Sequence, residues 1–146
     1  MKVNPIPEGY HTITPYLVVS DADKLMTFLK AAFNASGTAC GQNAAGQTLH
    51  AEMKIGSSMV MIGRVKESSQ ASTSMLYLYV NDTDKLYQQA MAAGAISLME
   101  PADQFYGDRN AGIQDPCGNQ WWIATRVENL TPEELAERSK AYQTQA

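Results

Sequence analysis

The sequence predicts an α+β fold made of two paired βαβββ modules, whose curved sheets surround a cleft, with one more helix at the C-terminus. Three observations predict it. A length of 146 residues fits one ordinary domain. Residues 20–25, SDADKL, return as NDTDKL at 81–86, with Asp21 and Asp82 61 positions apart. Each copy lies between a strand-like and a helix-like stretch, so we place module 1 at about 12–64 and module 2 at about 74–125.

The elements of module 1 follow from local pattern. Residues 12–19 are β-branched and aromatic, which favours a strand. Residues 21–33 carry apolar side chains at helical spacing, and Ser20 with Asp23 resembles a capping box at the start of this helix. A weak strand is expected at 36–40. Two more, at 49–55 and 58–64, are joined by Gly56-Ser57, a typical two-residue hairpin turn.

Module 2 repeats this order after a polar, Ser-rich linker at 65–73. The pattern predicts a strand at 74–80 and a helix at 83–93 that Gly94 closes. Strands at 97–100, about 109–114 and 120–125 complete the unit. A last helix is expected at about 131–142, because Thr131, Pro132 and Glu134 form a strong helix start. Its apolar face is small, so we expect loose packing or contact with a partner chain.

Composition narrows the class of partner. The net charge is −4, from 11 basic and 15 acidic residues, and no run of Lys or Arg occurs. These features argue against nucleic acid and anionic membranes as partners. No apolar stretch approaches the ~20 residues of a spanning helix, and the N-terminus has no apolar signal segment. Cys40 and Cys117 are isolated, which predicts a reducing, cytoplasmic location.

Side-chain alternation along the strands predicts which residues face away from the helices. Between the first strands of the modules the offset is 61, and for the last strands we use an offset of 62, taken from Gly56 and Gly118. The expected face away from the helices is apolar and aromatic: Thr14, Tyr16, Val18, Val60, Ile62, Met75, Tyr77, Tyr79, Trp122 and Ala124. Such a face can line a ligand cleft or fill a second core between the sheets.

Two motifs give the chain a family resemblance. The string DQFYGDR at 103–109 and the turn Asp115-Pro116-Cys117-Gly118, on paired βαβββ modules, resemble the glyoxalase/bleomycin-resistance/dioxygenase superfamily, also called the vicinal oxygen chelate superfamily. Pro7-Glu8-Gly9-Tyr10 and His50-Ala51-Glu52 resemble its PhnB-like branch. The resemblance covers roughly residues 5–137 and implies a homodimer whose modules pair within or between chains.

The same resemblance bears on metal chemistry. In the superfamily's metal enzymes each module supplies one ligand from its first strand and one from its last. Those positions correspond here to Thr14, Val60, Met75 and Trp122, none of which is a usual ligand for a hard metal. Asn119 also stands where the branch typically has a His. The residues therefore argue against the superfamily's customary metal site.

Other candidates remain open. His50 and Glu52 are two apart and point to one side of a strand, where they can bind a metal, exchange protons or form a structural pair. A strict two-residue turn places them on the face of the sheet opposite to that of Val60, which is away from the expected cleft. A register error of one residue would move them to the cleft side. Arg109 can present a cation to an anionic ligand or form an internal salt bridge. His11 is expected at the surface, and Cys117 as a small buried group.

The sequence thus predicts a small-molecule binding protein that holds an aromatic or amphipathic ligand with no metal cofactor, and that forms a homodimer. The expected ligand-binding residues are Thr14, Tyr16, Val60, Met75, Tyr77, Tyr79, Phe105, Arg109 and Trp122. The alternative is a lyase or isomerase that uses His50 and Glu52 with a divalent metal at an atypical site. A third class is a structural or interaction module, in which side chains fill the space between the sheets and leave no cavity.

Overall fold

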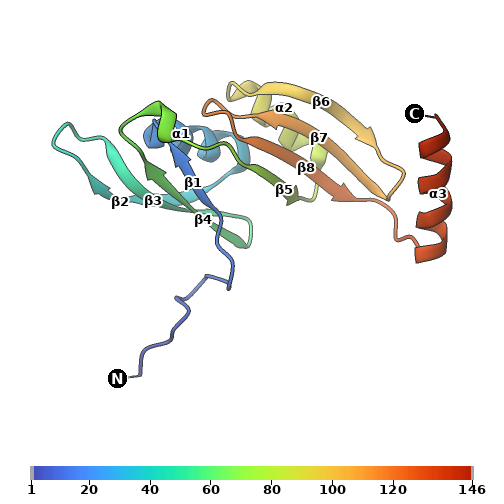
Figure 1. Cartoon of the computed structure of the whole chain (residues 1–146), viewed down its shortest axis with the longest axis horizontal. Coiled ribbons are helices and arrows are strands. Elements are labelled where there is room, and N and C mark those ends of the chain that lie inside the picture. Colours follow the sequence, from blue (N-terminus) through green and yellow to red (C-terminus); the bar gives the residue numbers. More distant parts are fainter. Residues whose placement is uncertain (1, 146) are drawn as a thin grey trace.

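The computed structural model describes residues 2–145, which form two four-stranded sheets, each backed by a helix, and a third helix at the C-terminus (Figure 1). The predicted α+β class with two modules is confirmed. Module 1 consists of β1 (Tyr16–Val19), α1 (Ala22–Phe33), β2 (Ser36–Gln42), β3 (Thr48–Ile55) and β4 (Ser58–Arg64). Module 2 consists of β5 (Met75–Tyr79), α2 (Thr83–Ala92), β6 (Ile96–Asp103), β7 (Asp108–Gln114) and β8 (Gln120–Arg126). A short 3₁₀ helix (Ser68–Gln70) lies between them, and α3 (Pro132–Gln145) follows.

Both sheets have the same topology, as a duplication requires. Their strand orders are β1-β4-β3-β2 and β5-β8-β7-β6, with β1 parallel to β4 and β5 parallel to β8. In register, Tyr16 lies opposite Met61 and Tyr77 lies opposite Trp122. The two modules therefore keep an offset of 61 through their last strands.

Each helix begins at an aspartate cap. The Asp21 carboxylate accepts a hydrogen bond from the Lys24 N–H at 3.0 Å, and Asp82 accepts one from Lys85 at 3.1 Å. The expected capping box of Ser20 and Asp23 is therefore wrong. Asp23 instead accepts bonds from the backbone N–H and the hydroxyl of Thr48, at 3.0 and 2.6 Å, and so ties α1 to β3.

The core lies between the helices and the sheets. Leu17, Leu29 and Ile62 are at most 1% exposed, and α1 packs against α2 across the junction of the modules. Trp121 is buried there too, with its ring 5.2 Å from that of Phe33 at the end of α1. One core thus joins the two modules along their helix side.

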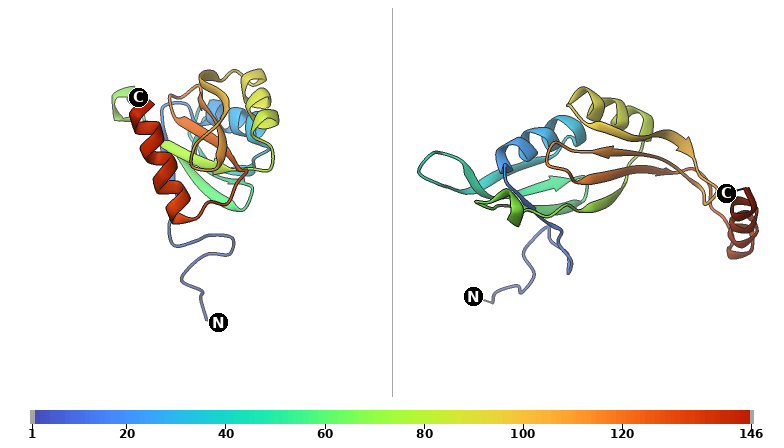
Figure 2. Two further views of the ribbon diagram at one scale, coloured as in Figure 1. Left: turned by 90° about the vertical axis from the view of Figure 1, so that its right-hand side faces the viewer. Right: turned by 45° about the horizontal axis from the view of Figure 1, so that its top comes forward.

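The two sheets lie side by side beneath the helices and do not face each other (Figure 2). The expectation that the modules' uncovered faces meet is not fulfilled within one chain. We call these surfaces open face 1 (Tyr16, His50, Glu52 and Met61) and open face 2 (Met75, Tyr77, Tyr79, Trp122, Asp108 and Asn110). In the described part of the chain, no helix is both long and apolar enough to span a membrane.

Helix α3 stands at the end of module 2, away from module 1 (Figure 1). The Tyr142 ring packs against Phe105, with 4.8 Å between ring centroids. Arg138 donates to the Phe105 carbonyl oxygen at 3.3 Å and pairs with Glu128. These contacts hold α3 against the loop between β6 and β7, as expected for a helix with a small apolar face.

The turn at residues 115–119 is organised by one buried carboxylate. Asp115 Oδ1 accepts from the N–H groups of Cys117 and Asn119, at 2.8 and 3.0 Å, and Oδ2 accepts from Trp121 Nε1 at 2.8 Å. Gly118 has a φ of +90°, which a side chain would strain. The Asp-Pro-Cys-Gly motif is thus explained by folding.

We expect Asp115→Ala to lower the free energy of unfolding by about 3 kcal/mol, because three donors lose their acceptor. Asp115→Asn keeps Oδ1 and should lose about half as much. Urea unfolding measures both values. Equal losses in the two variants would contradict the role assigned to Oδ1.

Candidate functional site

Open face 2 exposes large apolar side chains in a row along β5. Met75, Tyr77 and Tyr79 are 66%, 42% and 60% exposed, and they alternate with Leu76 and Leu78, which pack toward the core. The Tyr77 and Tyr79 rings meet edge to face, with 5.4 Å between centroids. Trp122 lies beside Tyr77 on the neighbouring strand. The aromatic surface predicted for this module is therefore formed.

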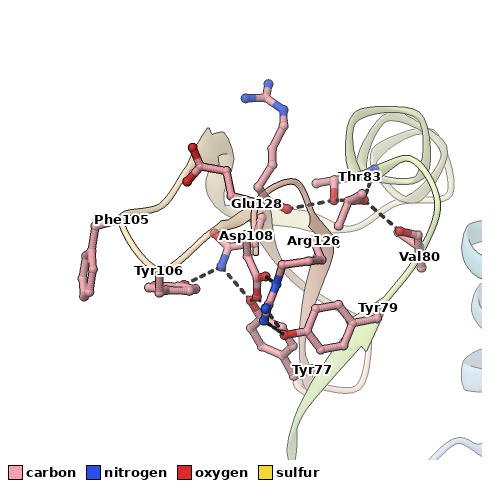
Figure 3. Close-up of polar contacts among 12 residues, drawn as sticks. Tyr77, Tyr79, Val80, Thr83, Phe105, Tyr106, Asp108, Arg126 and Glu128 are labelled. Atoms are coloured by element: carbon pink, nitrogen blue, oxygen red, sulfur yellow. Dashed lines mark hydrogen bonds and ion pairs between the residues drawn. The ribbon is translucent and has the colours of Figure 1, made fainter. Parts of the chain in front are cut away.

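A buried carboxylate lies among these tyrosines (Figure 3). Asp108 is 2% exposed, and its Oδ2 accepts from the hydroxyls of Tyr77 and Tyr79, at 2.8 and 2.9 Å. Its Oδ1 accepts from Arg126 Nε at 2.6 Å. Three strands, β5, β7 and β8, thus converge on one side chain.

The network extends to the amide of Asn110, also 2% exposed. Asn110 Nδ2 donates to the hydroxyl oxygens of Tyr77 at 3.0 Å and Tyr106 at 2.7 Å. Asp108, Asn110 and Gly112 alternate along β7 and share the open face. Gly112 makes room for the indole of Trp122, since a Cβ there would lie 2.7 Å from Trp122 Cη2.

The charges of this network compensate one another. Burial alone would raise the pKa of Asp108, but hydrogen bonds from Tyr77, Arg126 and Tyr79 outweigh it and hold that pKa below its usual range. Burial raises the pKa of Tyr77 above its usual range, and the Asp108 carboxylate adds to this shift. Tyr77 therefore stays protonated and donates, while Arg126 balances the carboxylate.

Open face 1 differs in chemistry. The Tyr16 hydroxyl lies 3.3 Å from His50 Nδ1, and Cys40 Sγ lies 3.8 Å from Glu52 Oε2. Burial and the nearby Glu52 carboxylate raise the pKa of Tyr10 to about 12. Met53 pairs with Val60, while His50 and Glu52 pair with Gly63 and Met61 on β4, so both side chains point away from Val60 as a strict two-residue turn predicts. The side that they occupy is the open one.

The error lies in the side assigned to Val60 and Ile62, and it has a physical origin. They are 3% and 0% exposed and belong to the core, so their predicted place on the open side is wrong. The offset of 62 came from two turn glycines, but module 1 turns at Gly56-Ser57 and module 2 over residues 115–119. Because the turns differ in length, matching their glycines shifts the strand by one residue and exchanges its faces.

The remaining predicted residues are scattered. Arg109 lies on the helix side of β7, where it pairs with Asp84 at 3.0 Å and Asp103 at 3.2 Å. Phe105 packs against Tyr142. Thr14 precedes β1 and lines a small hollow near His11. The structure brings Met75, Tyr77, Tyr79 and Trp122 together, with Tyr16 on the other open face.

Sequence reasoning missed Asp108, Asn110, Tyr106 and Arg126 as parts of this arrangement. A signal was available, because Asp108, Asn110 and Gly112 are spaced two apart at the start of the strand predicted at about 109–114. A groove of about 1000 Å³ also runs along the junction of the modules, between the β5 edge, α2 and the turn at residues 54–58. Tyr77 and Tyr79 contribute to its lining.

The donor set does not fit a metal at the superfamily's usual positions. Corrected for register, those positions hold Thr14, Met61, Met75 and Trp122, which offer no carboxylate or imidazole. Within residues 2–145, no three His, Cys, Asp or Glu side chains gather in a way that could hold a metal ion.

Comparisons with known proteins agree with this architecture. A family model described as Glyoxalase/Bleomycin resistance protein/Dioxygenase superfamily matches residues 9–123. A Mycobacterium bovis protein described as uncharacterized is 29% identical, over 92% of this chain and 93% of its own. TioX from Micromonospora sp. ML1 superposes with a TM-score of 0.68 at 24% identity, over 80% of this chain and 99% of its own. A glyoxalase/bleomycin resistance protein/dioxygenase from Nocardioides superposes with a TM-score of 0.61 at 19% sequence identity, over 84% of this chain and 87% of its own. The structural likenesses show the shared fold.

We expect Asp108→Asn to lower the free energy of unfolding at pH 7 by about 2–3 kcal/mol, because the variant leaves donors unpaired. The pKa of Asp108 is lowered on folding, so its contribution is present above about pH 4 and is lost as the pH falls further. The difference between wild type and variant should therefore shrink below pH 4 in urea unfolding curves.

Asp84→Asn is the matched control, since its pair with Arg109 is solvent-exposed and should contribute under about 1 kcal/mol. Equal effects of the two substitutions, or a difference that does not depend on pH, would contradict the role of Asp108.

Proposed function

The chain belongs to the Glyoxalase/Bleomycin resistance protein/Dioxygenase superfamily, and on that premise we propose that it binds an aromatic or amphipathic small molecule on open face 2, without a metal. A fold shared by many functions does not name a ligand. The proposal therefore depends on the chemistry of this chain's own side chains. Sequestration of a toxic aromatic compound is one concrete form of it.

One observation carries the proposal. Met75, Tyr77 and Tyr79 are all more than 40% exposed in one row, next to Trp122. A contiguous apolar patch of this kind commonly marks a binding surface. Aromatic rings supply a large contact area, and their hydroxyls and indole N–H supply polar ends that orient a ligand.

Electrostatics favours an uncharged ligand. Asp108 is already paired with Arg126, and the Arg126 guanidinium lies 5.9 Å from the centre of the Tyr79 ring. An external cation would have to displace that guanidinium from the ring, and an anion would have to compete with the Asp108 carboxylate for it. Stacking of a neutral planar molecule conflicts with neither group.

We further propose that a second copy of the chain completes the site. Both open faces point to the same side and neither covers the other. In a two-fold dimer, open face 1 of one copy can cover open face 2 of the other, and the symmetry makes two equal clefts. This arrangement buries the exposed Tyr16 and Met75 side chains together.

Two finer assignments accompany this proposal. The PhnB-like branch is supported by Pro7-Glu8-Gly9-Tyr10 and by His50-Ala51-Glu52, whose His50 and Glu52 side chains lie on open face 1. A reducing, cytoplasmic location is supported by two free thiols, of which Cys40 is exposed.

A second candidate function is a lyase or isomerase that uses His50 and Glu52 with a divalent metal. The observation that favours it is the place of both side chains on open face 1, with the Tyr16 hydroxyl 3.3 Å from His50 Nδ1. Elemental analysis of protein purified without added metal separates the two candidates. One divalent ion per chain that is lost in His50→Ala would favour the enzyme.

The binding proposal can be tested with Nile red, a neutral aromatic dye whose fluorescence rises on apolar surfaces. We expect wild type to enhance the fluorescence and Trp122→Ala to weaken dye binding by about tenfold, which corresponds to loss of one stacked aromatic contact. Tyr142→Ala is the matched control, since it removes an aromatic residue on α3 that is 54% exposed. Equal losses in both variants would contradict the proposed site.

A further inference from the structure

Asn110 presents a buried hydrogen-bond acceptor that nothing in the described residues uses. Its side chain is 2% exposed, and its Oδ1 atom has no hydrogen-bond partner. A buried carbonyl oxygen without a partner costs free energy, and native proteins keep few of them. Such an atom on a ligand-binding face calls for a donor from outside the chain.

The surrounding network fixes the orientation of this amide. The Tyr77 proton is donated to Asp108, so the Tyr77 oxygen can only accept from Asn110. Turning the amide over would set its carbonyl oxygen against an oxygen that has no proton left. The nitrogen of Asn110 must therefore face Tyr77, and Oδ1 must point elsewhere. Tyr106 also accepts from this nitrogen, so its own proton is free to be donated.

A second unpaired polar atom lies nearby. Trp122 Nε1 is buried and has no acceptor among the described residues. Asn110 is opposite Ala124, and Gly112 is opposite Trp122, so Asn110 and Trp122 are diagonal neighbours on one face. Diagonal neighbours are about 7–8 Å apart between Cα atoms. One unpaired acceptor and one unpaired donor thus belong to neighbouring side chains of open face 2.

We propose that open face 2 recognises a neutral, planar ring amide or imide by its polar edge. The ring N–H donates to Asn110 Oδ1, and a ring carbonyl oxygen accepts from Trp122 Nε1, while the ring stacks on the neighbouring aromatic side chains. This inference rests on the proposed binding function and adds the ligand class to it. The Tyr106 hydroxyl can serve a second carbonyl oxygen.

The test compares 1,8-naphthalimide with its N-methyl derivative, which has the same aromatic rings but no N–H to donate. We expect the parent compound to bind the full-length chain about 10- to 100-fold more tightly in calorimetric titrations, because the methyl compound leaves Asn110 Oδ1 unpaired. Trp122→Phe, which keeps a ring but removes the N–H, should weaken binding of the parent compound about tenfold.

NMR supplies an internal control. The chain has two tryptophans, and the Trp121 indole N–H is already bonded to Asp115. On addition of naphthalimide the Trp122 indole signal should move while the Trp121 signal stays in place. An unmoved Trp121 signal in Trp122→Phe also shows that this variant is folded.

The outcomes separate the two proposals. Equal affinities for the two compounds, with signals of open face 2 moving for both, would overturn the ring-amide inference and leave the binding function standing. Signals that move for neither compound, together with no Nile red binding, would overturn both proposals. Tighter binding of the parent compound without movement of the Trp122 signal would also overturn the role given to Trp122.

Discussion

The buried negative charge of Asp108 is the constraint on which open face 2 depends. A carboxylate that is 2% exposed must be hydrogen-bonded and paired. Here β5 supplies two tyrosine hydroxyls and β8 supplies the Arg126 guanidinium. The three strands are thereby joined at one point, and both tyrosine rings are held at the surface by their hydroxyl ends.

That constraint passes on to the next residue of the face. Because the Tyr77 proton is used by Asp108, Asn110 must give its amide nitrogen to Tyr77 and keep its carbonyl oxygen unpaired. Gly112 then leaves space for the Trp122 indole. The unused acceptor and donor thus follow from one buried charge and the two-residue spacing along β7.

The two modules share one topology but carry different chemistry on their open faces. Module 1 places His50 beside Tyr16 and Cys40 beside Glu52, whereas module 2 carries a neutral aromatic surface with its charges paired. Since the faces are not opposed within one chain, a two-fold dimer would set one kind of surface against the other. The duplication would then form a cleft with two unlike walls.

Much of the fold could be predicted from the sequence, because Asp21 and Asp82 begin equivalent helices and apolar residues alternate in the strands. The side of the sheet on which Val60 lies could not be predicted, because the alignment of the last strands rested on glycines in two turns of unequal length. Arg109 appeared available for a ligand, yet Asp84 and Asp103 hold it on the helix side. The two-residue spacing of Asp108, Asn110 and Gly112 was visible in the sequence, but the partners of Asp108 on β5 and β8 depend on strand register. How the modules sit depends on contacts between α1 and α2, which no local pattern encodes.

Native mass spectrometry of the purified full-length chain tests the central claim most directly, because it reports assembly and bound small molecules together. The account predicts twice the chain mass of 15.9 kDa, with naphthalimide bound up to two molecules per dimer. Trp122→Ala should keep the dimer and lose the bound compound. Two results would contradict the account. One is a wild-type chain that binds naphthalimide as a monomer, and the other is a Trp122→Ala dimer that binds as much naphthalimide as the wild-type dimer.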